Sequence, residues 1–186
     1  MSDTELQPPT QAAAQLLPRV ICANQPRLHL RPVQSADMDF LRQLYATTRA
    51  AELAQVDWTD QQKRQFVDFQ FHAQHTYYGE HFPDASRDIV VVDGVDAGRL
   101  YLDLRATEIR LIDIALLPEH CGRGTGGILL RQLLQVAEDR RLPVSIHVEQ
   151  NNPALRLYQR LGFLPVEEQG VYFLMRWSPS AHETKD

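Results

Sequence analysis

The chain has 186 residues, which is enough for one domain with a substantial core and too short for two ordinary domains. Hydrophobic residues make up 44% of the chain and charged residues 23%, a balance that excludes disordered and fibrous proteins. The 24 acidic residues outnumber the 19 Lys and Arg, for a net charge of -5. The basic excess of a dedicated nucleic-acid binder is therefore missing.

Cysteine usage and hydropathy bear on the compartment. The two cysteines, Cys22 and Cys121, lie far apart and outside any metal-ligand spacing, so neither a disulfide framework nor a zinc site is expected. No run of about 18 apolar residues is present, which predicts that nothing spans a membrane. The acidic start of the chain lacks the basic and apolar segments of a secretory signal. We therefore expect a protein of the cytoplasm.

The two ends of the chain predict segments outside the folded domain. Residues 1–26 combine an acidic start, prolines and a short Ala/Leu stretch, which favours a poorly ordered N-terminal arm. Residues 178–186 form a polar C-terminal tail. The folded domain is therefore expected to span residues 27–177.

The first half of this domain predicts a strand, two helices and a meander of strands. Apolar and polar side chains alternate over 28–33, and helical spacing follows over 36–50 and from Thr59 to about residue 80. Asp93-Gly94 then lies between β-rich runs, a strong hairpin signal. The strands that we expect in this region cover 89–92, 95–104 and 109–117.

The second half predicts alternating helices and strands. The expected elements are a helix over 128–140, a strand over 144–148, a helix over 153–161 and strands near 163–166 and 171–177. The strands over 109–117 and 144–148 flank one helix, so they should run parallel in a right-handed βαβ crossover. The fold class is therefore α/β: a mixed sheet with an antiparallel meander, one crossover and helices on both faces.

A glycine-rich loop, Gly122-Arg123-Gly124-Thr125-Gly126-Gly127, joins the crossover strand to its helix. Glycines let the backbone turn sharply and present successive N–H groups, and the helix dipole adds positive potential, as in a phosphate cradle. A tight turn that binds nothing is the alternative. Gly122-x-Gly124-x-x-Gly127 also matches a dinucleotide fingerprint, with Glu149 about 20 residues further on. A single crossover after a meander disfavours that interpretation.

Two motifs point to one family. Cys121-x-x-Gly124-x-Gly126, and Asn151-x-x-Ala154 continuing to Tyr158, Gly162 and Phe163, resemble the two signatures of the GNAT superfamily, the acetyl-coenzyme A-dependent N-acetyltransferases. The resemblance covers about residues 27–177 and agrees with the predicted element order. The family's first motif opens with Gln or Arg, where this chain has Cys121.

The resemblance implies a binding slot for acetyl-coenzyme A. The two parallel strands would splay apart at their C-terminal ends, and the pantetheine arm would pair with main-chain groups between them. The cofactor-binding residues implied are Leu116, Leu117, Cys121, Gly122, Arg123, Gly124, Thr125, Gly126, Gly127, Asn151 and Tyr158. Since main-chain groups of the loop carry most of the pyrophosphate binding in this family, we expect affinity to survive the change at Cys121.

The resemblance further implies direct attack of a primary amine on acetyl-coenzyme A in a ternary complex. Tyr158 would be the acid that assists the departing thiolate, with ring packing as the alternative role. The amine must first lose a proton, because a lysine-like amine has a pKa of about 10.4. Asp113 and Glu149 are candidate bases, and His147 is a candidate for base or acceptor contact. All three lie on the two parallel strands or at their ends. A structural role is the alternative for each of them, and a chain of water molecules is a further candidate for removing the proton.

The acceptor side is less defined by sequence. The loop over about 50–60 is where this family builds its acceptor pocket, so Trp58 is a candidate wall, with core packing as the alternative. His72, His75 and His81 lack a cysteine or well-spaced carboxylate that would complete a metal site, so no metal is predicted. The expected partner is a small-molecule or peptide amine, not a nucleic acid or a membrane. A second copy of the chain is one candidate partner. A non-catalytic acyl-coenzyme A binding module is the alternative function.

Overall fold

The computed structural model describes residues 16–22 and 26–180. An eight-stranded sheet with the order β1-β2-β3-β4-β5-β6-β8-β7 forms its centre. The strands are β1 (Val20–Cys22), β2 (Leu28–Pro32), β3 (Ser86–Val92), β4 (Val95–Leu104), β5 (Ile109–Leu116), β6 (Val144–Glu149), β7 (Leu164–Gln169) and β8 (Tyr172–Trp177). The helices are α1 (Met38–Leu53), α2 (Asp60–His81), α3 (Thr125–Arg140) and α4 (Leu155–Arg160), with 3-10 turns η1 (Ser35–Asp37) and η2 (Pro118–His120). None of the helices in this described part is both long and apolar enough to cross a membrane.

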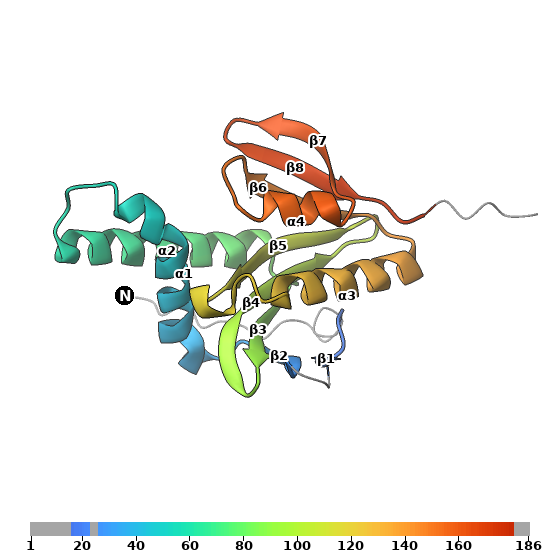
Figure 1. The fold of residues 1–186 in the computed structure, drawn as a ribbon, viewed down its shortest axis with the longest axis horizontal. Helices are drawn as coiled ribbons and strands as arrows, with labels where there is room; N and C mark the ends of the chain where they lie inside the picture. The colour runs from blue at the N-terminus through green and yellow to red at the C-terminus, as the bar shows by residue number, and fades with distance from the viewer. Residues whose placement is uncertain (1–15, 23–25, 181–186) are drawn as a thin grey trace, which may run out of the picture.

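The predicted mixed sheet is confirmed. Strands β2 to β5 pair antiparallel in chain order, and β5 pairs parallel with β6 through the crossover helix α3. Figure 1 shows α3 crossing one face of the sheet while α1 and α2 lie on the other side. The antiparallel pair β7–β8 continues the sheet beyond β6.

Strand alternation builds a core on each face. Val90 and Val92 of β3 belong to the core that α3 covers, whereas Ile89 and Val91 pack with α1 and α2. Successive residues of a strand point to opposite faces, so a run of four apolar residues serves both cores. This explains why residues 89–92 are all apolar.

The ladder between β5 and β6 is short. Only three register pairs join them, from Ile109↔Val144 to Leu111↔Ile146. Beyond that point β5 stays paired with β4, and β6 stays paired with β8. The two strands therefore diverge, as the family resemblance implied, and their facing edges become free.

Part of the predicted N-terminal arm belongs to the folded body, which corrects the sequence-based boundary. Leu16 and Leu17 are buried in the α3-side core, and β1 pairs with β2. The Leu30 N–H donates to the Arg19 carbonyl at 2.8 Å. The three-residue strand is too short to show alternation, so the sequence pattern missed it. Residues 1–15 and 23–25 of the predicted arm, and 181–186 of the predicted tail, lie outside the described residues.

Candidate active site

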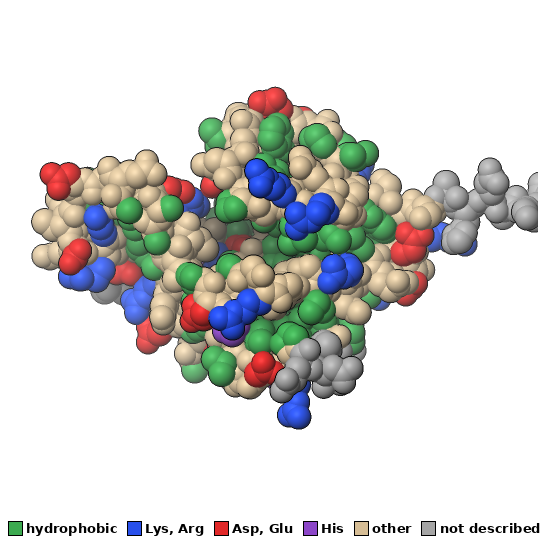
Figure 2. All heavy atoms as spheres, viewed as in Figure 1, with side chains coloured by type: hydrophobic (Ala, Val, Ile, Leu, Met, Phe, Trp, Pro, Cys, Tyr) green, Lys and Arg blue, Asp and Glu red, His purple; other side chains and the backbone are tan. Residues whose placement is uncertain are grey.

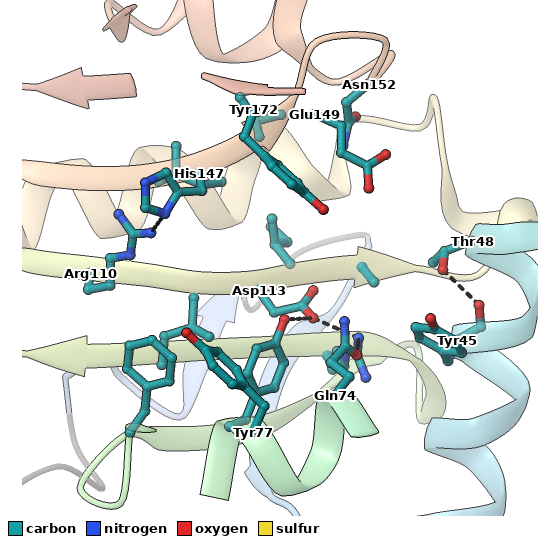
Figure 3. A pocket seen from close by; sticks show the side chains of 18 of the residues that line it. Tyr45, Thr48, Gln74, Tyr77, Arg110, Asp113, His147, Glu149, Asn152 and Tyr172 are labelled. Carbon is teal, nitrogen blue, oxygen red and sulfur yellow. Dashed lines mark hydrogen bonds and ion pairs between the residues drawn. The ribbon is translucent and has the colours of Figure 1, made fainter. Parts of the chain in front are cut away.

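A cavity of about 540 Å³ opens where β5 and β6 diverge, on the side of the sheet that faces α1 and α2. Residues from α1, α2, β5, β6, α4 and β8 line it. Figure 3 shows Asp113, Glu149, His147 and Tyr172 projecting into one shared space, with Thr48 at one end and Arg110 at the other. The structure thus brings together groups as far apart in the chain as Thr48 and Tyr172.

A buried ion pair forms part of the cavity wall. Asp113 Oδ2 accepts from Arg99 Nη2 at 2.6 Å and from the Tyr78 hydroxyl at 3.1 Å. Arg99 is only 3% exposed and also donates to Gln74 Oε1 at 2.8 Å. Burial by itself lowers the pKa of Arg99, but Asp113 and two neighbouring tyrosines together raise it above its ordinary value, so the guanidinium stays charged. Both bonds to Asp113 end on one oxygen, and Asp113 Oδ1 accepts none from the described residues.

A second carboxylate lines the opposite strand. Glu149 Oε1 of β6 lies 3.4 Å from Arg49 Nη1, which also pairs with Glu52 at 3.0 Å. Arg49 lies over the Tyr45 ring, 5.6 Å from its centroid, so α1 holds the guanidinium in place. Glu149 therefore has a longer ion pair than Asp113 and a partner that it shares with another carboxylate.

A third charged group lies at the far end. Arg110 of β5 contacts His147 Nδ1 through Nη2 and donates through Nη1 to Ser145 Oγ at 3.3 Å. Burial lowers the pKa of both Arg110 and His147, and for His147 the charge of Arg110 lowers it further. The imidazole is therefore neutral at pH 7.

Tyr158 of α4 also lines this cavity. Its residue is 3% exposed, and its ring packs edge-on against Phe163 with centroids 5.6 Å apart. Burial raises the pKa of the Tyr158 hydroxyl above its ordinary value, and the charge of Asp113 adds to this. The phenol is therefore protonated at neutral pH and can donate its hydrogen to a developing anion.

The glycine loop forms the entry to α3. Gly122 and Gly124 have φ of +70° and +89°, which L side chains rarely adopt, and a Cβ on either would meet nothing within 4 Å. Gly124 precedes the first residue of α3, which begins three residues earlier than the sequence pattern suggested. Since the first N–H groups of a helix have no intrahelical partner, the loop and helix start offer open donors next to free space.

The free edge of β5 ends beside this loop. The Leu117 N–H donates to the Ala97 carbonyl at 2.8 Å, on the β4 side. Because N–H directions alternate along a strand, the Leu116 N–H faces the gap toward β6. Cys121 is exposed, and its sulfur lies 3.6 Å from the Leu116 carbonyl oxygen. The residue that departs from the family motif is therefore at the edge of the slot.

Basic side chains flank the outer opening. Figure 2 shows the molecule hollowed between α3 and α4, with basic side chains, drawn in blue, over both helices. The sequence of α3 contains Arg131 and Arg140, and that of α4 contains Arg156 and Arg160. Such a hollow suits a ligand that carries several phosphates.

Some predicted site residues lie elsewhere. Trp58, expected as a pocket wall, packs edge-on against Phe66 at 5.3 Å and is not among the residues that line the cavity. Asn151 is exposed, whereas its neighbour Asn152 lines the cavity and accepts from the Ala154 N–H at 2.8 Å. On α2, the His81 ring stacks on Tyr77. Within the described residues no group of three metal-ligating side chains comes together.

Sequence reasoning missed the three arginines of the cavity, Arg49, Arg99 and Arg110. Arg99 was the most detectable, because it is a charged residue inside the apolar strand run 95–104. A charge in such a position needs a buried partner. Its partner, Asp113, had been singled out only as a candidate base.

The fold matches solved acetyltransferases. PaiA N-acetyltransferase from Thermoplasma acidophilum, solved with coenzyme A, is 14% identical and gives a TM-score of 0.61 over 81% of this chain and 98% of that chain. An acetyltransferase from Thermus thermophilus is 20% identical, with a TM-score of 0.59 over 81% of this chain and 96% of that one. Naa50 from Arabidopsis thaliana, in complex with the bisubstrate analogue CoA-Ac-MVNAL, is 17% identical, with a TM-score of 0.51 over 81% and 98%.

These structural similarities establish the fold, and the match to a family model establishes which family the chain belongs to. No curated protein matches the chain. The model of the acetyltransferase (GNAT) family, however, matches residues 41–163, which include β5, the glycine loop, β6 and α4. The predicted resemblance is confirmed, and the chain belongs to the GNAT acetyltransferase family.

Proposed function

We propose that the protein is an N-acetyltransferase that moves an acetyl group from acetyl-coenzyme A to a primary amine by direct attack in a ternary complex. One observation carries the proposal. The free edges of β5 and β6 lead from the glycine loop into a cavity lined by Tyr158 and two carboxylates, Asp113 and Glu149. The glycine loop, the free edge of β5 and the acid–base groups of the cavity thus follow one another from the loop into the cavity.

The residues present fit acetyl-coenzyme A, which would supply the acetyl group as an activated thioester. The N–H groups of the Gly122–Gly127 loop and the first turn of α3 would hold the pyrophosphate, with open space at Gly122 and Gly124. The main chain at Leu116 would pair with the pantetheine arm as an added strand does. The same N–H row offers a donor for the thioester oxygen.

The attacking amine has to be neutral, and the cavity offers two carboxylates with different surroundings. Asp113 is held by Arg99 at 2.6 Å and by Tyr78, so it is suited to hold the acceptor amine through its second oxygen. Glu149 lies 3.4 Å from Arg49 Nη1, is hydrogen-bonded to Tyr172 and has an incompletely buried side chain. We assign to Glu149, directly or through water, the removal of the amine proton.

Tyr158 would stabilise the departing thiolate. A thiol has a pKa near 8.5, well below that of a phenol in this buried position. Complete transfer of the phenolic proton is therefore uphill, and the hydroxyl acts mainly as a hydrogen-bond donor while the thiolate forms. A cytoplasmic location, a homodimer and the small-molecule or peptide nature of the acceptor stay predictions from the sequence.

The proposal is tested by incubating the protein with acetyl-coenzyme A and pooled primary amines. We expect thiol release that depends on both amine and protein, and an acetylated product about 42 mass units heavier, as replacement of a hydrogen by an acetyl group requires. A burst of thiol release without amine, followed by slow turnover, would contradict direct attack, because it indicates an acetylated protein intermediate. Coenzyme A binding without release from any amine would favour the non-catalytic module.

A further inference from the structure

The three arginines that line the cavity differ in their partners. Arg99 pairs with Asp113 at 2.6 Å, and Arg49 pairs with Glu52 at 3.0 Å. Arg110 has no carboxylate within ion-pair distance among the described residues. One cationic side chain of the cavity therefore lacks a directly paired carboxylate among the described residues.

The contacts of Arg110 are all neutral. Its two hydrogen-bonding partners are the Ser145 hydroxyl and His147 Nδ1, and neither carries a formal negative charge. Glu108 acts on Arg110 through its charge, but this carboxylate is paired with Arg105 at 3.1 Å and Arg176 at 3.6 Å. A guanidinium has five N–H donors, so several remain available.

Burial makes this arrangement costly without a ligand. A charged group taken partly out of water loses solvation, and the lowered pKa of Arg110 reflects that loss. Neutral His147 beside it adds no second charge at pH 7. An incoming anion would restore the compensation that Arg49 and Arg99 already receive from the protein.

We propose that Arg110 binds an anionic group of the acceptor, so that the acceptor is an amine carrying a carboxylate or a phosphate at its other end. This inference rests on the proposed acetyl transfer and names the chemistry of its acceptor. Figure 3 shows Arg110 and His147 meeting across β5 and β6 at the end of the cavity away from Tyr45 and Thr48. An anion at this position would lie at one end of the cavity.

The spacing along β5 sets the length of the acceptor. A bulge between the pairs Tyr101↔Asp113 and Leu102↔Leu111 shifts the alternation, so Arg110 and Asp113 both line the cavity. Three residues of strand separate their Cα atoms by about 10 Å. An amine held at Asp113 and an anion held at Arg110 therefore require a linear spacer of several carbons.

Matched acceptors and matched variants test the inference. The acceptors are 4-aminobutyrate and 6-aminohexanoate, the corresponding butylamine and hexylamine, and 6-aminohexyl phosphate. The variants are Arg110→Gln, which removes the charge, Arg110→Lys, which keeps it, and Arg42→Gln. Arg42 is an exposed arginine of α1, paired with Asp39, that does not line this cavity. Initial rates with acetyl-coenzyme A give kcat and KM, and calorimetry with coenzyme A present gives acceptor binding without turnover.

We expect the parent protein to prefer at least one anionic acceptor over its matched alkylamine by about 10-fold or more, through KM and binding. Arg110→Gln should lose that preference, Arg110→Lys should keep part of it, and Arg42→Gln should keep all of it. The carboxylate and phosphate arms identify which anion fits.

Two results overturn the inference. One is equal binding of anionic acceptors and alkylamines to the parent protein. The other is an anion preference that survives in Arg110→Gln. Because binding is measured without turnover, absence of acetyl transfer together with a preference that depends on Arg110 contradicts the proposed function and supports the anion site.

Discussion

The two faces of the central strands do different work although they share a backbone. On the α3 face, Leu129, Leu130 and Leu133 pack against apolar residues of β5 and β6, and each leucine is at most 1% exposed. On the opposite face, the same two strands present Asp113 and His147 to the cavity. Strand alternation, shifted by the bulge in β5, separates an apolar face from a charged one.

This difference indicates that the α3 face mainly stabilises the fold and that the cavity face carries the functional groups. Burial of apolar surface stabilises the fold by about 25 cal/mol per Å², so the α3 face contributes without any directional requirement. The cavity face carries a buried guanidinium and a half-buried one, which destabilise unless compensated. Substitutions on the two faces should therefore have separable effects.

The largest expected effect is on catalysis, from Tyr158→Phe. The ring and its packing against Phe163 remain, and only the donor to the thiolate is lost. Turnover should fall roughly 10²- to 10⁴-fold, while KM for acetyl-coenzyme A changes little, because the lost interaction strengthens mainly in the transition state. Single-turnover rates measure the chemical step directly.

Tyr101→Phe removes an equally buried hydroxyl that does not line the cavity. Because the Tyr101 side chain hydrogen-bonds Arg99, the partner of Asp113, this variant should lower the rate, but much less than Tyr158→Phe. A Tyr158→Phe protein within threefold of the parent in the chemical step would assign Tyr158 to packing. Since burial raises the pKa of Tyr158, any activity loss that its ionisation causes should begin only above pH 10.

On the apolar face, Leu133→Ala should affect stability and leave specificity intact. Leu133 is fully buried, so truncation should lower the free energy of unfolding by about 2–5 kcal/mol, measured by chemical denaturation. KM values for both substrates should stay within about twofold of the parent at a temperature where the variant is folded. A large rise in KM would mean that the two faces are not separable.

Gly124→Val tests the loop against a matched turn elsewhere. Gly124 and Gly94 have nearly the same φ, +89° and +86°, and both have open space at Cβ. Valine should strain both positions alike, but only Gly124→Val should weaken coenzyme A binding, by about 100-fold, since a branched side chain would occupy the phosphate approach. Equal coenzyme A affinity in the two variants, measured by calorimetry, would mean that the glycine loop is a turn with no role in phosphate binding.

The smallest effect concerns pH. The folded-state pKa of His147 lies below its ordinary value of 6.5, first because of burial and then because of Arg110. As pH falls, His147 is therefore protonated in the unfolded chain before it is protonated in the folded one. Its contribution to the free energy of unfolding should be complete above pH 6.5 and should decline as pH falls toward the folded-state pKa. Because His147 is solvent-exposed, screening limits the loss to a few tenths of a kcal/mol. His147→Gln should flatten that slope in denaturation curves between pH 4.5 and 7, and an unchanged slope would contradict it.

Much of the fold was predictable from local sequence patterns. The hairpin at Asp93–Gly94, the leucine periodicity of α3 and the glycine loop each depend on neighbours within a few residues, so they were predictable. The three-residue β1 was not, because its place in the sheet depends on β2 rather than on its own pattern.

The candidate site was predictable only in part. Tyr158 and the loop followed from motif spacing, whereas the partner of Asp113 did not, because Arg99 reaches it from the neighbouring strand. The bulge that places Arg110 and Asp113 on one face has no local sequence signal. Of the two roles weighed for Trp58, pocket wall and core packing, the structure shows a ring contact with Phe66, and Trp58 is not among the residues that line this cavity.

The most direct test of the central claim is residue-resolved amide hydrogen exchange with and without coenzyme A. If the ligand lies along the free edge of β5, the Leu116 amide should exchange more slowly when coenzyme A is bound, together with the first turn of α3. The adjacent Leu117 amide, already bonded to Ala97, should change much less. Saturating coenzyme A that leaves Leu116 and the start of α3 unprotected, or that protects other strands instead, would contradict the account.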